Sequence, residues 1–203
     1  MYKSIRVICL KISFIITTFN FFACSNGYKK IPDGFDDPDN LIKMVHPDKD
    51  YTYWQFCKWP AEKDFVIFSS GKNPGNITFD PPFGGLFTGC MPAMCYKYIS
   101  YIYKGKIGYV NTPEQLKQFL GRIDNLEEAL LLARSAEDLD IDNDERKGGS
   151  YFIEKNGYHL LLMHYKSCPQ TKESIFLRIE KDSGIVQKVN LGAYFKSKNC
   201  IVY

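Results

Sequence analysis

Residues 150–190 read SYFIEKNGYHLLLMHYKSCPQTKESIFLRIEKDSGIVQKVN and contain two β-hairpin signals in succession. In the first, Asn156 and Gly157 separate two runs of apolar and aromatic residues, and an Asn-Gly pair accepts the positive φ angles of a type I′ turn. In the second, the turn residues 181–184 (KDSG) separate residues 174–180 from residues 185–189. Adjacent hairpins favour antiparallel pairing, so this stretch predicts an antiparallel meander.

Strand patterns also precede this stretch. Residues 51–58 alternate in side-chain character, and residues 65–68 (FVIF) form a short apolar run. Residues 96–103 (YKYISYIY) predict a strand, which the turn Lys104-Gly105-Lys106 joins to a partner at residues 107–110. Residues 71–89 contain five glycines and three prolines and predict a long surface loop.

Two helices are predicted between the strand patterns. Thr112, Pro113 and Gln115 form a helix start, because Thr can cap, Pro suits the first helical position and Gln completes a capping box. Gly121 is expected to end this helix. The second helix is expected to begin at Asp124 or Asn125, and its apolar residues recur at helical spacing: Leu126, Ala129, Leu130 and Ala133. Together the elements predict one α+β domain over residues 51–203, an antiparallel sheet of hairpins with two helices packed on one face.

The N-terminus has the layout of a secretory signal. Lys3, Arg6 and Lys11 form a basic start, and residues 12–23 are an apolar run broken by four polar residues. That run is shorter than the roughly 20 apolar residues that a membrane-spanning helix needs. Residues 1–23 are therefore predicted to be a signal peptide.

The end of this segment, Phe21-Phe22-Ala23-Cys24, resembles the lipobox of bacterial lipoproteins. The resemblance implies that the Cys24 thiol carries a diacylglyceryl group and that cleavage makes Cys24 the new N-terminus. Acyl chains such as palmitate contribute about 0.8 kcal/mol per buried CH₂, so several chains hold a protein on a membrane. Ser25 after the cysteine implies, by the same resemblance, the outer membrane of the cell envelope. Cleavage after Ser25 and an uncleaved anchor are the alternatives.

Residues 24–50 are polar, rich in Pro and Asp, and lack helical or strand periodicity. This composition predicts a flexible tether between the lipid and the domain.

The charge distribution argues against nucleic acid as a partner. The whole chain has a formal net charge of +3, and residues 1–23 hold three basic and no acidic residues, so 3 − 3 = 0 remains for the mature part. Lys and Arg are scattered among Asp and Glu instead of forming a basic stripe. The membrane, through the lipid, is the partner that the sequence indicates.

Seven cysteines divide by position. Cys9 lies in the signal and Cys24 would carry lipid, which leaves Cys57, Cys90, Cys95, Cys168 and Cys200. An exported protein meets an oxidising compartment, so disulfides are expected. The preferred pairs are Cys90 with Cys95, across a turn, and Cys168 with Cys200, which would fasten the C-terminal tail to the sheet. Five is an odd number, so one cysteine is left without an intramolecular partner.

Residues 90–95 (CMPAMC) hold four sulfur side chains, which suits Cu(I) because thiolates and thioethers are its preferred ligands. The possible copper ligands are Cys90, Met91, Met94 and Cys95. A disulfide loop with inward methionines is the favoured alternative, and a thiol-redox role is a weaker one because four residues separate the two cysteines.

Other motifs stop short of a site. Asp138, Asp140 and Asp142 match the start of an EF-hand loop, but Asn143 stands where the turn needs Gly and Gly149 where a bidentate Glu is needed. A solvated loop is expected there instead. His159 and His164 lie five apart on a predicted strand, so they are expected to point to opposite faces.

No catalytic triad or phosphate loop is recognisable, and no cofactor is expected. The leading hypothesis is a non-enzymatic, membrane-anchored lipoprotein of the cell envelope that binds a protein or small ligand through the aromatic and glycine-rich residues 81–96. The alternatives are a Cu(I)-binding or thiol-redox envelope protein, and an envelope hydrolase with a cleft that gathers His164, a carboxylate and a cysteine.

Overall fold

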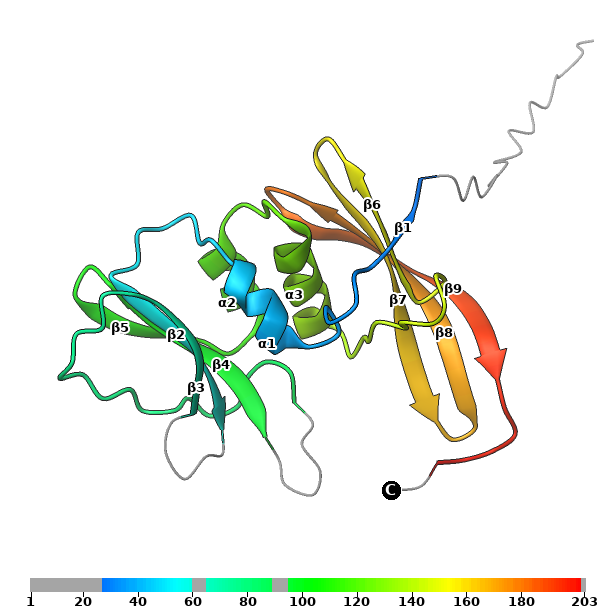
Figure 1. Ribbon diagram of the computed structural model, residues 1–203, viewed down its shortest axis with the longest axis horizontal. Coiled ribbons are helices and arrows are strands. Elements are labelled where there is room, and N and C mark those ends of the chain that lie inside the picture. Colours follow the sequence, from blue (N-terminus) through cyan, green and yellow to red (C-terminus); the bar gives the residue numbers. More distant parts are fainter. Residues whose placement is uncertain (1–26, 60–64, 89–94, 202–203) are drawn as a thin grey trace, which may run out of the picture.

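A computed structural model describes residues 27–59, 65–88 and 95–201 of the chain (Figure 1). The predicted signal segment and Cys24 lie outside these residues. None of the helices in the described ranges is long and apolar enough to cross a membrane.

The described strands form two antiparallel sheets. The smaller sheet has the order β3-β2-β4-β5 and consists of β2 (Tyr53–Trp59), β3 (Phe65–Gly71), β4 (Tyr96–Tyr103) and β5 (Lys106–Val110). The larger sheet has the order β1-β6-β7-β8-β9 and consists of β1 (Lys29–Lys30), β6 (Gly149–Glu154), β7 (Gly157–Ser167), β8 (Gln170–Glu180) and β9 (Gly184–Lys196).

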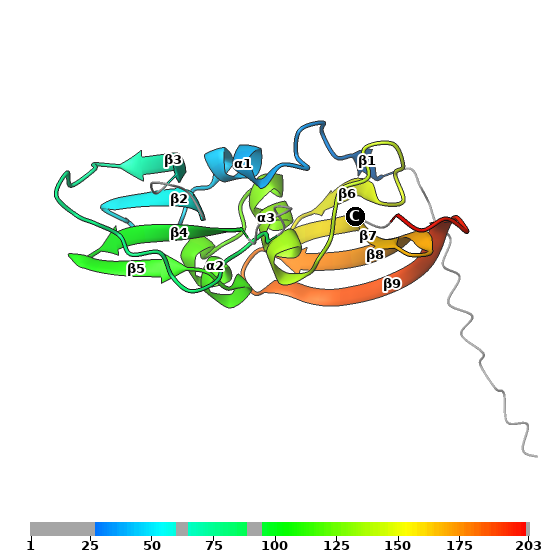
Figure 2. The ribbon, with the colours of Figure 1, turned by 90° about the horizontal axis from the view of Figure 1, so that it is seen from below.

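The helices lie between the two sheets (Figures 1 and 2). They are α1 (Pro38–Leu41), the short 3₁₀ helix η1 (Ile42–Met44), α2 (Pro113–Leu120) and α3 (Leu126–Ala136). The mixed α+β class is confirmed, although most of the described structure is β. The prediction of one sheet covered on one face is wrong, because hairpin signals show which neighbours pair but not which hairpins share a sheet.

Local signals for α2 and α3 are confirmed. Thr112 Oγ1 accepts a hydrogen bond from the Gln115 N–H at 3.3 Å, and Asn125 Oδ1 accepts one from the Glu128 N–H at 2.8 Å. Gly121 ends α2 with a φ of +71°, a conformation that favours glycine. Both helices therefore begin at their capping residues, and α2 also ends at its predicted glycine.

One hydrophobic core joins both sheets to the helices. On α2, the Phe119 ring packs edge-on against Trp54 of β2, with 5.4 Å between ring centroids. On α3, Leu130, Leu131 and Leu132 are all buried, since the helix has a sheet on either side. A helix that is apolar around most of its circumference thus fits a position between two layers.

Residues 27–50 are not the flexible tether that their composition predicted. Lys29 pairs with Tyr151 of β6, and Ile31, Leu41 and Ile42 are at most 1% exposed. The few apolar residues of this segment follow no helical or strand period, yet most of them contact the core: Ile31, Phe35, Leu41, Ile42 and Val45. Met44 is exposed. The Pro and Asp residues of this segment therefore indicate turns between residues that are held in the core, and not a flexible chain.

The C-terminal tail is fastened to the β7–β8 turn, as predicted, by the disulfide between Cys168 and Cys200. Two backbone hydrogen bonds support the link, from the Gln170 N–H to the Asn199 carbonyl and from the Ile201 N–H to the Ser167 carbonyl, each at 2.9 Å. Cys57 is buried in β2. The predicted pairing of Cys90 with Cys95 involves a residue outside the described ranges.

Candidate binding cleft between the two sheets

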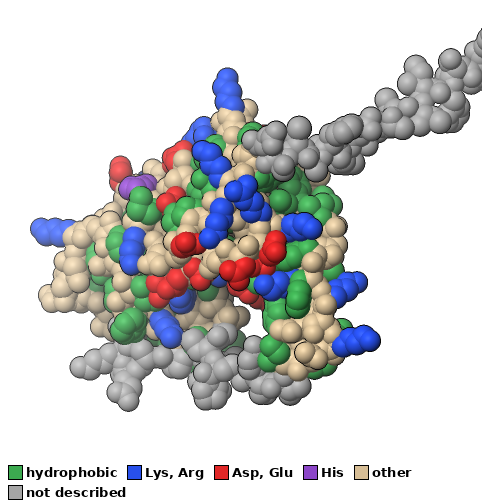
Figure 3. Space-filling model, turned by 45° about the vertical axis from the view of Figure 1, so that its right-hand side comes forward, with side chains coloured by type: hydrophobic (Ala, Val, Ile, Leu, Met, Phe, Trp, Pro, Cys, Tyr) green, Lys and Arg blue, Asp and Glu red, His purple; other side chains and the backbone are tan. Residues whose placement is uncertain are grey.

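A cavity of about 650 Å³ lies between a loop that bridges to β4 of the smaller sheet and a segment that bridges to β7 of the larger sheet. Its lining comes from residues 85–88 in the long loop before β4, from Pro113 at the start of α2, and from residues 134–140 at the end of α3. Figure 3 shows a hollow between the two halves of the molecule, with acidic side chains gathered along its upper edge. Segments about 50 positions apart in sequence thus form one concave surface.

The loop wall of this cavity is held to the smaller sheet. Leu86 forms a two-way bridge with Lys97 of β4, with N–H to carbonyl distances of 2.6 and 2.7 Å. Gly85 permits this approach, because a Cβ at that position would collide with the Lys97 carbonyl oxygen. The wall is therefore an extra, short strand-like segment along β4.

Phe87 in the same wall has an unusual backbone conformation. Its φ is +52°, which is an outlier for a bulky residue. The ring contacts Phe56 of β2 edge-on, with a centroid distance of 6.4 Å. Strained residues of this kind concentrate at binding and active sites, where the surrounding structure holds them in place.

Arg134 anchors the opposite wall. Its side chain is 10% exposed and donates to the Leu139 carbonyl at 3.2 Å and to the Asp36 carbonyl at 2.7 Å, while Nη2 lies 3.5 Å from Asp140 Oδ1. Burial lowers the pKa of Arg134, and the neighbouring Asp140 opposes this shift. The guanidinium thus fixes the turn that follows α3.

A second cavity of about 350 Å³ lies on the other side of this turn. It shares Glu137, Asp138 and Leu139 with the first cavity. The rest of its lining comes from the larger sheet: His164, Lys166, Glu173, Ile175, Lys188 and Asn190. The two cavities therefore have a common wall, which we call the 137–139 wall.

Glu173 is the centre of the polar side of the second cavity. Its carboxylate accepts hydrogen bonds from Lys166 Nζ at 2.7 Å and Asn190 Nδ2 at 3.1 Å, and it lies 3.3 Å from His164 Nδ1. The hydrogen bond from Lys166, followed by those from His164 and Asn190, lowers the pKa of Glu173 to about 2. Glu173 is therefore a carboxylate throughout the physiological range.

The two strand histidines do not form one site. His159 lies 2.9 Å from Glu154, between the rings of Phe152 and Phe176, and burial lowers its pKa. His164 lines the second cavity instead. Among the described residues no cysteine lines that cavity, so the set of histidine, carboxylate and cysteine that a hydrolase or redox site was expected to gather is incomplete.

The aspartate loop is not wholly solvated. Asp142 is buried, and its carboxylate accepts from Lys172 Nζ and from the Tyr194 hydroxyl, both at 2.8 Å. Burial alone would raise the pKa of Asp142, but the hydrogen bonds from Lys172 and Tyr194 lower it. Asp142 therefore fastens the loop to β8 and β9 and faces inward.

Metal ligands do not gather in the described part of the chain, where no group of three or more His, Cys, Asp or Glu side chains is placed to hold an ion. Of the copper ligands considered from sequence, Cys90, Met91 and Met94 lie outside the described residues. Cys95 is buried just before β4.

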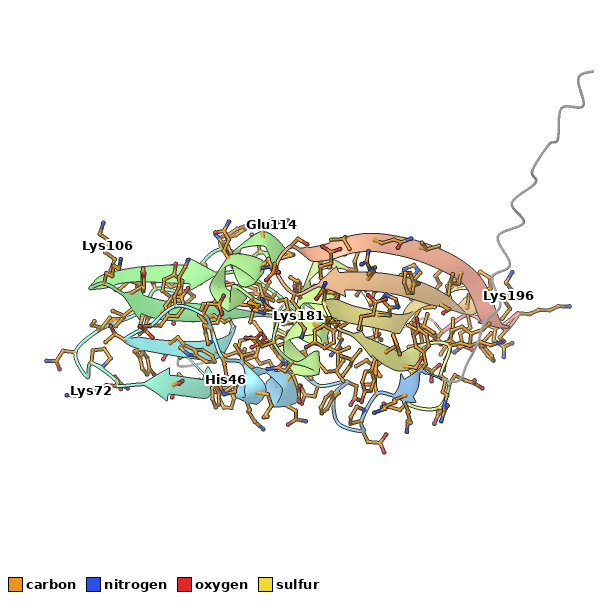
Figure 4. The ribbon with its side chains drawn as sticks, turned by 90° about the horizontal axis from the view of Figure 1, so that it is seen from above. His46, Lys72, Lys106, Glu114, Lys181 and Lys196 are labelled. Atoms are coloured by element: carbon orange, nitrogen blue, oxygen red, sulfur yellow. A yellow bond between two sulfur atoms is a disulfide. The ribbon has the colours of Figure 1, made fainter. Side chains whose placement is uncertain are left out.

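Charged side chains also occur along the length of the molecule outside the two cavities (Figure 4). Lys72 and Lys106 lie at the far end of the smaller sheet, and Lys196 lies at the far end of the larger one (Figure 4). The side chains of Glu114 and Lys181 lie nearer the middle.

No protein-family model matches the chain, and no curated protein or solved structure shows a significant similarity to it.

Proposed function

We propose that the protein is a lipid-anchored lipoprotein of the bacterial cell envelope that binds a small ligand or a protein segment in the cleft between its sheets, without catalysing a reaction. The observation that carries the proposal is the cavity of about 650 Å³ lined by residues 85–88 and 134–140. Its volume falls within the roughly 300–1,000 Å³ typical of ligand sites.

Three features of the lining support binding. The cavity lies between segments that are bridged to different sheets, and ligand sites often lie where structural units meet. Both of its walls are fixed, one by the Leu86 bridge to β4 and the other by Arg134. Phe87 keeps a costly backbone conformation at this place. A rigid, preformed surface reduces the entropy that a ligand must lose on binding.

A fragment screen by NMR on the mature chain tests the binding proposal. Amino acids, amines and monosaccharides serve as probes, and the expected result is chemical-shift changes that cluster at residues 85–88 and 134–140. Ala136→Trp fills the cavity from an exposed position in its lining and should abolish those shifts. Shifts that scatter over the surface, or that persist in Ala136→Trp, would refute the cleft as the site.

The anchor needs its own test. Intact mass of protein purified from membranes should correspond to residues 24–203 plus acyl chains, and Cys24→Ser should release the protein from the membrane fraction. A chain that begins elsewhere without lipid contradicts the anchoring half of the proposal and leaves the cleft untouched.

A hydrolase is the second candidate, because His164 faces a cavity with its ring beside the Glu173 carboxylate. A carboxylate that orients an imidazole is a familiar general-base arrangement. No Ser or Cys lines this cavity among the described residues, so the imidazole would have to activate water. Equal rates of p-nitrophenyl acetate hydrolysis by the native protein and His164→Asn would exclude this role.

A further inference from the structure

We infer, on the basis of the proposed function, that the ligand is an extended peptide segment that crosses the 137–139 wall and places a Lys or Arg side chain at Asp138. The inference concerns the chemistry of the ligand and joins the two cavities into one binding surface.

The 137–139 wall is a fixed element that a ligand could lie across. Leu139 is 5% exposed and lines both cavities, and its carbonyl accepts from Arg134. Next to it, Asp140 and Met163 of β7 exchange two backbone hydrogen bonds of 2.8 Å. The wall is thus tied to α3 on one side and to the larger sheet on the other.

One of the carboxylates around the wall has no ion-pair partner among the described residues. Three cations line the two cavities, and each has a lining carboxylate as its partner: Arg134 with Asp140 at 3.5 Å, Lys166 with Glu173 at 2.7 Å, and Lys188 with Glu137 at 2.5 Å. Asp138 lines both cavities, is exposed, and has no ion pair with any residue that the structure describes. The uncompensated charge is therefore negative and lies at the middle of the surface.

This arrangement favours a cationic group at the centre of the ligand. Complementary charge adds specificity to a binding surface, and a negative group on the ligand at this place would be repelled. An ammonium or guanidinium beside Asp138 supplies the partner that Asp138 lacks within the described chain.

The walls on either side suit a peptide. The first cavity offers the apolar Leu86 and Phe87 together with the polar Ser135, and the second offers Ile175 together with Asn190. The apolar groups suit side chains of a peptide, and the hydrogen-bonding groups suit its backbone amides. Cavities of about 650 and 350 Å³ are large enough for a few residues of extended chain.

The test is isothermal titration of the mature chain with acetyl-Ala-Ala-Lys-Ala-Ala-amide and with the same peptide carrying norleucine or Glu in place of Lys. The Lys peptide should bind about fivefold more tightly than the norleucine peptide, as expected for one partly exposed charge pair. Raised salt should reduce the difference. Asp138→Asn should remove the preference, whereas Asp144→Asn, an exposed carboxylate of the same loop outside both cavities, should keep it.

Equal binding of the Lys and norleucine peptides, or an unchanged preference in Asp138→Asn with a native melting temperature, would overturn the inference. Absence of binding by all three peptides would also overturn it. Fragment shifts at residues 85–88 and 134–140 would still stand as support for the cleft in either case, so the two proposals fail separately.

Discussion

Glu128 accepts a hydrogen bond from the backbone N–H of His46 at 2.9 Å, although 82 positions separate the two residues in the chain. The second carboxylate oxygen accepts from the Asp124 N–H at 2.8 Å. Glu128 is fully buried in α3, and burial raises its pKa in spite of these two hydrogen bonds. A single carboxylate thus joins the N-terminal segment to the start of a central helix.

Replacing Glu128 by Gln should lower the free energy of unfolding by about 1–3 kcal/mol. The amide keeps one acceptor oxygen, but its NH₂ group then faces a partly buried backbone N–H that also needs an acceptor. Urea denaturation measures the change. Glu127→Gln is the matched control one position earlier on α3, and it should change stability by no more than about 0.5 kcal/mol. Equal effects of the two variants would contradict the capping role of Glu128.

Arg134→Met should weaken both stability and the cleft. The variant leaves the Asp36 and Leu139 carbonyls without their charged donor, and hydrogen bonds to charged groups contribute about 1.5–3 kcal/mol each. The free energy of unfolding should fall by at least about 2 kcal/mol, and amide exchange should become faster at residues 137–140. Exchange that stays slow in this turn would show that Arg134 does not hold the wall.

Glu173 is expected to make the free energy of unfolding depend on pH in the acid range. Its pKa is about 2 in the folded protein against an ordinary value of 4.5, so the charged form is favoured by folding. The stabilisation is therefore present above about pH 4.5 and is lost as the pH falls toward about 2. Glu173→Gln should be less stable than the native protein at pH 7 and equally stable near pH 2. Denaturant midpoints measured across this range give the comparison, and a constant difference would refute it.

The disulfide between Cys168 and Cys200 closes a loop over a sequence separation of 32 residues. Loop-closure entropy for that length corresponds to about 3–4 kcal/mol. The double variant Cys168→Ser, Cys200→Ser should lose stability of this order in denaturant melts. Reductant should destabilise the native protein more than the double variant, and an equal response would place the stabilising bond elsewhere.

Much of the local structure could be predicted from sequence, because its signals are short-range. The β6–β7 hairpin, the Thr112 cap and the Cys168–Cys200 link each depend on residues whose roles are fixed by their own chemistry. The turn of that hairpin falls at residues 155–156, because Gly157 already pairs with Glu154, and neither Asn156 nor Gly157 has the positive φ that the type I′ prediction required. The number of sheets could not be predicted, because no feature of the β5 and β6 sequences indicates that these two strands belong to different sheets. Which distant strands pair with each other depends on the tertiary packing of the whole chain.

The cleft was only partly foreseeable. Residues 85–88 belong to the loop chosen from sequence for its aromatic and glycine content, and they do line the larger cavity. Phe83 of the same loop is fully exposed and lines neither cavity. Arg134 and Glu137 gave no sequence signal, because a charged residue at a helix end usually faces solvent. Their role depends on which strands lie opposite.

The pairing of β1 with β6 also limits how far the folded domain can lie from Cys24. Only residues 25–28 separate Cys24 from β1, and four residues span at most about 14 Å. In the proposed lipoprotein the domain would therefore ride close to the bilayer surface, with little freedom to tilt or turn. Its cleft would therefore stay within a short distance of the membrane, and only ligands that approach the membrane surface could bind to it.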